Sequence, residues 1–119
     1  MKRLVLVALL LLMSAPLFAG VRKDTYPMAC SALWPAVKAT ARNSGDYAVV
    51  FLSNDEMIAS FAIGSGQGLR FGSAVLNAQS DACELQVQVP EHGNFTDDTG
   101  NFKKRVDKTL ADMQATKKP

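Results

Sequence analysis

The chain has 119 residues, of which 48% are hydrophobic and 20% are charged, and its formal net charge is +2. This length is enough for one domain with a modest hydrophobic core. One histidine and two cysteines that are expected to pair with each other leave no ordinary zinc site.

Residues 1–19 have the three parts of a secretory signal peptide. Lys2 and Arg3 form a positive start, and the apolar run Leu4–Met13 follows. That run is too short to cross a bilayer as a helix, which needs about 20 residues. The sequence therefore predicts cleavage after Ala19, with the neighbouring bond after Gly20 as the alternative. The mature protein is then a single domain in the periplasm or secreted.

The first predicted element of the mature domain is a helix over Cys30–Asn43. Apolar residues recur in it at helical spacing, from Cys30 through Leu33 and Val37. Pro35 is tolerated because it lies in or just after the first turn, where a missing N–H matters least.

Four strands are predicted next, at Tyr47–Ser53, Met57–Ile63, Leu69–Ala78 and Ala82–Val89. The first is apolar throughout, which is typical of a strand covered on both faces. The fourth alternates between apolar and polar residues, so one of its faces is expected in the core and the other in water. Short turns between successive strands favour an antiparallel meander.

A second helix is predicted over Asn101–Gln114, followed by a frayed tail from about residue 114. Its apolar stripe consists of Phe102, Val106, Leu110 and Met113. The order helix, four strands, helix indicates an α+β two-layer sandwich with both helices on one face of the sheet.

The two cysteines are predicted to form a disulfide. Cys30 belongs to the apolar stripe of the first helix and Cys83 to the core face of the fourth strand, so both side chains point into one layer. Exported proteins with two cysteines usually oxidise them. Two separate buried thiols are the alternative. A thiol–disulfide enzyme is not expected, because no Cys-x-x-Cys motif is present.

No catalytic, cofactor-binding or metal-binding residue is predicted, and no cofactor. His92 stands alone in a turn, without the partner that a general base needs. The glycine-rich segment Gly64–Gly68 is followed by a predicted strand, whereas a phosphate-binding loop precedes a helix N-terminus.

Two surfaces are candidates for interaction. If the helices cover one face of the first strand, either Tyr47, Val49 and Phe51 or Ala48, Val50 and Leu52 remain without cover on the other. An apolar strip of this kind often marks a partner site, and we take Ala48, Val50 and Leu52 as its candidates. The second helix adds the basic residues Lys103, Lys104 and Lys108. These form either a site for an anionic partner or a solvated face that balances the acidic body of the chain.

The stretch Tyr26–Trp34, followed by Asn43–Tyr47, resembles the opening of several small bacterial envelope proteins. The similarity extends to the acidic turn Asp55-Glu56 and to the segment Phe102–Arg105. It is most similar to uncharacterised periplasmic α+β proteins, and more distantly to the helix-grip domains of a lipoprotein in the outer-membrane β-barrel assembly machinery. The resemblance implies a fold and an envelope location, and it transfers no site residue.

The function expected from these observations is that of a non-enzymatic exported binding protein. Its partner would be an envelope or secreted protein or an anionic surface. Export excludes ordinary nucleic-acid binding, and no stable membrane anchor is expected. The alternative is a small exported inhibitor of a hydrolase that acts through a protruding loop, either Gly64–Gly68 or Pro90–Asn94.

Overall fold

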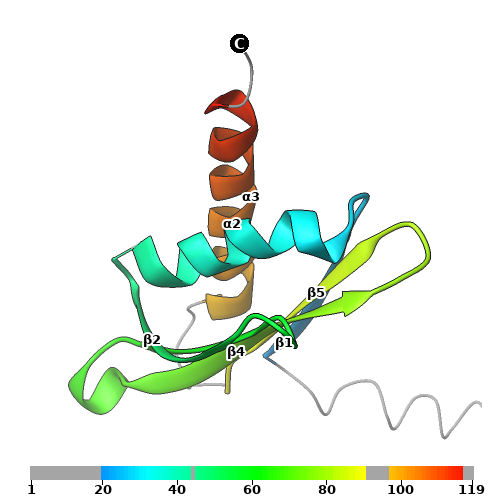
Figure 1. Ribbon diagram of the computed structural model, residues 1–119. Helices are drawn as coiled ribbons and strands as arrows, with labels where there is room; N and C mark the ends of the chain where they lie inside the picture. The colour runs from blue at the N-terminus through cyan, green and yellow to red at the C-terminus, as the bar shows by residue number, and fades with distance from the viewer. Residues whose placement is uncertain (1–19, 44, 91–96, 117–119) are drawn as a thin grey trace, which may run out of the picture.

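The computed structural model describes residues 20–43, 45–90 and 97–116, which form an α+β domain with an antiparallel sheet on one side and helices on the other (Figure 1). The predicted signal peptide and His92 lie outside these residues. The strands are β1 (Val21–Tyr26), β2 (Tyr47–Ser53), β3 (Ile58–Ile63), β4 (Arg70–Ala78) and β5 (Cys83–Gln88). The helices are α2 (Cys30–Asn43) and α3 (Asp98–Thr116), with a short 3₁₀ turn, η1, at Gly66–Gly68.

The sheet of the described residues has five strands in the order β1-β5-β4-β3-β2, and every neighbouring pair is antiparallel. The prediction of four strands was therefore wrong, because β1 was missed. β1 pairs with β5 from Val21 opposite Gln88 to Tyr26 opposite Cys83. Its sequence has consecutive charges at Arg22, Lys23 and Asp24, so it lacks the apolar pattern that identifies a strand.

Both helices lie on the same side of the sheet, as expected. Figure 1 shows α2 lying over the strands, while α3 rises steeply from them and its C-terminal end is far from the sheet. The core between these layers contains Phe61 of β3 and Phe102 of α3, whose rings stack with centroids 4.8 Å apart. Burial of two such rings contributes a large part of the stability of a small domain.

Only the first half of α3 packs tightly. Phe102 and Val106 are fully buried, whereas Leu110 and Met113 are partly buried and pack against the edge of the core. The expectation that the whole stripe faces the sheet therefore holds for its first two residues only. The steep angle of α3 explains the difference, because each further turn lies farther from the strands.

The disulfide between Cys30 and Cys83 is present, with the two Cα atoms 4.9 Å apart. It joins the start of α2 to the start of β5, within the layer where both side chains were expected. A covalent loop of this length stabilises a fold by roughly 4 kcal/mol through the entropy of the unfolded chain. The disulfide thus ties the helix layer to the sheet where β1 leads into α2.

Candidate functional site

The face of the sheet that points away from the helices, called the outer face below, is shaped by a β-bulge in β2. Val49 is opposite Phe61 and Phe51 is opposite Ser60, so Val50 is an extra residue between them. A bulge of this kind reverses the alternation of side chains along the strand. It makes the two faces of β2 different from those of a regular strand.

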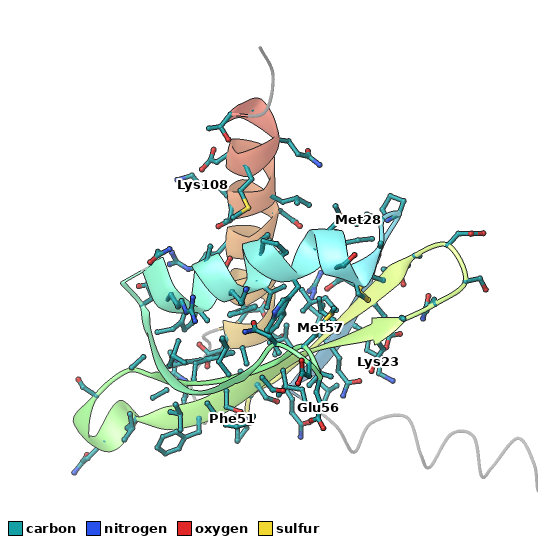
Figure 2. The ribbon with its side chains drawn as sticks, in the orientation of Figure 1. Lys23, Met28, Phe51, Glu56, Met57 and Lys108 are labelled. Atoms are coloured by element: carbon teal, nitrogen blue, oxygen red, sulfur yellow. A yellow bond between two sulfur atoms is a disulfide. The ribbon has the colours of Figure 1, made fainter. Side chains whose placement is uncertain are left out.

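Regular alternation would place Tyr47, Val49 and Phe51 on one face of β2 and Ala48, Val50 and Leu52 on the other, but the bulge exchanges Phe51 and Leu52. Directly opposite residues share a face. Leu52 is opposite the buried Ala59 and packs against the core. The expectation that Leu52 shares a face with Ala48 and Val50 is therefore wrong. Phe51 takes its place on the outer face, as its labelled side chain in Figure 2 shows.

Three large apolar side chains on this face are exposed, and they are called the outer patch below. The exposed fractions are 61% for Val50, 55% for Phe51 and 57% for Phe71. They belong to adjacent rows of the sheet, because Phe51 is opposite Ser60 while Phe71 is opposite the next outward residue, Ala62. Exposed apolar side chains that gather in this way mark interaction sites more often than single ones do.

The outer patch borders a shallow hollow of about 470 Å³. Its lining includes two apolar members of the patch, Val50 and Phe71, and several polar side chains near them. The polar lining residues are Ser60, Ser73 and Gln88, and Pro90 also lines the hollow. An apolar floor beside hydroxyl and amide groups can take an apolar side chain of a partner and hydrogen-bond the polar atoms next to it.

The basic residues of α3 form a separate surface. Lys103 is paired with Asp107 and lies over the Tyr26 ring. Lys104 and Lys108 are exposed, and no ion pair to another described residue is seen for either. Figure 2 shows Lys108 on the protruding part of α3, on the opposite side of the molecule from Phe51. The predicted apolar and basic candidates therefore do not form one site.

Arg70 connects the sheet to α3 through a largely covered ion pair. Its Nε and Nη2 donate to the two carboxylate oxygens of Asp98 at 2.5 and 2.6 Å, and its Nη1 donates to the carbonyl oxygen of Gly68 at 2.8 Å. The hydrogen bonds to Asp98 raise the pKa of Arg70 above its usual value. The guanidinium has a structural role here, because it fixes α3 and the loop before β4 together.

The start of α3 also explains why two aspartates occur in succession. The Asp97 carboxylate accepts a hydrogen bond from the backbone N–H of Gly100 at 3.1 Å, which caps the helix. A Cβ on Gly100 would lie 2.1 Å from that carboxylate, so a larger residue there would displace the Asp97 side chain. The helix consequently begins at Asp98, earlier than the apolar stripe indicated.

The two tyrosines of the core are held in their neutral form. Burial raises the pKa of Tyr26, and so does the hydrogen bond that its hydroxyl donates to Asp107 at 2.5 Å. Burial likewise raises the pKa of Tyr47, whose ring lies beside Phe61 and Phe102. Burial is the largest cause of both shifts.

A polar cleft of about 450 Å³ lies where β2 begins, lined in part by Asp46, Arg70, Asp98 and Arg105. Its charges are already paired, since Arg105 contacts Asp46 at 2.8 Å and Arg70 contacts Asp98. Within residues 20–43, 45–90 and 97–116, no group of three or more His, Cys, Asp or Glu side chains is placed to hold a metal ion.

The loop Gly64–Gly68 is a compact turn that extends from the end of β3, as Figure 1 shows. Gly64 and Gly66 have φ values of 78° and 59°, which only glycine adopts readily. A Cβ on Gly64 would lie 2.6 Å from the carbonyl oxygen of Gly68, so the loop closes tightly on itself. The other loop considered from the sequence, Pro90–Asn94, lies outside the described residues apart from Pro90.

No family model matches the sequence, and no curated protein matches it. Among solved structures, the chain is similar to that of Ara h 8.0201, with a TM-score of 0.51 and 12% sequence identity over 76% of this chain and 96% of that chain. The similarity is one of fold. The chain is also similar to TTHA0849 from Thermus thermophilus, with a TM-score of 0.44 and 10% identity over 76% of this chain and 84% of that chain.

In the described part of the chain, no helix is long and apolar enough to cross a membrane.

The sequence identified Val50 as a candidate and missed Phe71. β4 alternates Phe71 and Ser73 with Gly72 and Ala74. This pattern could have shown that Gly72 and Ala74 face the helices while Phe71 faces outward. The bulge has no such signal, because β2 is apolar on both sides of it.

Proposed function

We propose that the protein is a non-enzymatic exported binding protein, periplasmic or secreted, that recognises a partner protein with the outer patch. The observation that carries the proposal is the exposure of Phe51 and Phe71 on one face, beside a hollow with Ser60, Ser73 and Gln88 at its polar side. Interface cores are enriched in aromatic residues, and their rims are polar.

The disulfide supports the proposed location. Disulfides persist in oxidising compartments and are rare in the cytosol, and Cys30 and Cys83 form one here. The apolar run at the N-terminus supplies the signal for export in this proposal.

A matched pair of variants tests the proposed function. Phe71→Lys places a charge in the outer patch, and Ala111→Lys places the same charge on an exposed position of α3. Tagged protein is used to isolate its partner from envelope extract, and binding to the purified partner is then measured. We expect Phe71→Lys to weaken binding at least tenfold, since truncating or charging a central aromatic contact costs about 2 kcal/mol or more, and Ala111→Lys to bind as the parent does. Equal binding by the two variants would refute the proposal.

The hydrolase-inhibitor alternative is supported by the closed loop at Gly64–Gly68. A loop that is rigid before binding loses less entropy on insertion into an active site, and residues 64–67 are exposed. If the isolated partner is a hydrolase whose activity falls with the parent and with Phe71→Lys, but not with Gln67→Lys, this alternative is correct and the outer patch is not the site.

A further inference from the structure

The two edges of the sheet differ in the features that protect an edge strand from pairing. The edge strand β1 has the charged residues Arg22, Lys23 and Asp24 among its six residues. The other edge strand, β2, has the sequence YAVVFLS, without a charge or a proline. Unpaired backbone groups of an edge strand are a template for another strand, and proteins usually protect such edges with charged residues, proline or a β-bulge. Of these features, β2 has the bulge at Val50 but neither a charge nor a proline.

β2 is also apolar on both of its faces. Val49 is exposed on the helix side, whereas Val50 and Phe51 are exposed on the outer face. Among the described strands, β2 pairs with β3 alone. The backbone groups on the other edge of β2 therefore have no partner among these strands. A strand added there would satisfy these groups and cover apolar side chains above and below the sheet at the same time.

We propose that β2 pairs with the β2 strand of a second copy of this chain, antiparallel and around a two-fold axis near Val50. The pairing joins the sheets of the two copies into one continuous sheet. A two-fold axis requires the same surface from both copies, and an uncharged strand meets this requirement because self-pairing brings no like charges into contact.

The charges at the two ends of β2 are complementary in this arrangement. Arg42, in the last turn of α2, lies near the start of the strand, where Arg105 is already paired with Asp46. The acidic turn residues Asp55 and Glu56 follow its end. Antiparallel pairing places the start of one strand beside the end of the other, so Arg42 of each copy lies toward the acidic turn of its partner. A parallel arrangement would bring like charges together.

The same features limit the assembly to two copies. Each copy uses its uncharged edge, and the charged β1 strands remain at the two outer ends of the joined sheet, where they resist further pairing. The bulge at Val50 twists the edge and keeps the pairing short. The two outer patches become neighbours across the axis, which gives a partner one larger apolar surface. The inference stands on the edge of the sheet and not on the partner-binding function of its outer face.

The test compares one charge at each edge of the sheet. Val50→Lys places two lysines close to the axis, and Thr25→Lys places the same residue at an exposed position of β1. Molar masses are measured by analytical ultracentrifugation over a range of concentrations, on disulfide-bonded protein. We expect twice the mass of one chain for the parent and for Thr25→Lys. For Val50→Lys we expect a dissociation constant raised by about tenfold or more, because like charges then face each other across the axis.

Amide hydrogen exchange on the parent gives a second measurement that does not depend on the folding of a variant. The amides of β2 that point away from β3 should exchange more slowly as the protein concentration rises, and those at the outer edge of β1 should not change. The proposal is overturned if the parent has the mass of one chain at every concentration, if a folded Val50→Lys variant keeps the dimer, or if β2 exchange is independent of concentration. Phe71→Lys should leave the dimer intact, so failure of the proposed function is distinguishable from failure of this inference.

Discussion

Asp98→Asn tests the connection between the sheet and α3, because it removes the charge from the Arg70 pair while it keeps the shape of the side chain. The side chains of Arg70 and Asp98 are 13% and 11% exposed, and both line an open cleft. The cost therefore lies between the roughly 0–1 kcal/mol of a surface pair and the 3–5 kcal/mol of a fully buried one. Asp98 also lies in the first turn of α3, where a negative charge contributes about 0.3–1 kcal/mol through the helix dipole.

The expected loss for Asp98→Asn is about 2 kcal/mol, and for a domain of this size it corresponds to a fall in Tm on the order of 10 °C. The assay is thermal unfolding followed by circular dichroism, with the disulfide intact. Asp24→Asn is the control, because its pair with Arg22 is more exposed, at 42% for Arg22 and 19% for Asp24. Equal shifts for the two variants would refute the reasoning, since they would show that the burial of the Arg70 pair has no energetic consequence.

Three further predictions concern the core. Phe102→Ala should lower the free energy of unfolding by about 3–5 kcal/mol, whereas Leu110→Ala should cost clearly less because Leu110 is only partly buried; urea denaturation compares them. Replacing both Cys30 and Cys83 by Ala should cost roughly 4 kcal/mol, measured in the same way, and an unchanged midpoint would contradict the role given to the disulfide. The pKa of Tyr26 is raised in the folded state, so the contribution of its neutral hydroxyl to stability is fully present below the unfolded pKa of about 10 and is lost as the pH rises toward the folded pKa. Tyr26→Phe should therefore lose less stability than the parent between pH 9 and about 11, and an identical pH profile for the two proteins would count against this reasoning.

The sequence predicted the elements whose pattern is local. α2 has the predicted bounds, and the four predicted strands and α3 differ from the observed ones by at most three residues at each end. The disulfide could be predicted because helical spacing placed Cys30, and alternation placed Cys83, in the same layer. These predictions succeed because each rests on the spacing of apolar residues within one element.

The features that the sequence did not predict depend on contacts between distant parts of the chain. β1 is a strand because β5 offers it an edge, and its charged residues give no pattern of their own. The bulge at Val50 depends on how β2 fits against β3, and it moves Leu52 to the core and Phe51 to the outer face. The steep rise of α3 from the sheet leaves Leu110 partly exposed, and the regular apolar stripe of this helix gives no sign of it.

The central claim is that the outer patch contacts a partner protein, and site-specific photocrosslinking in cells that produce the protein tests it most directly. A photoreactive phenylalanine analogue is placed at position 71, and the same analogue at position 111 on α3 is the control. The account predicts a crosslink from position 71 to another protein, with none from position 111. The absence of a crosslink at position 71, or the same crosslinks from both positions, would contradict it.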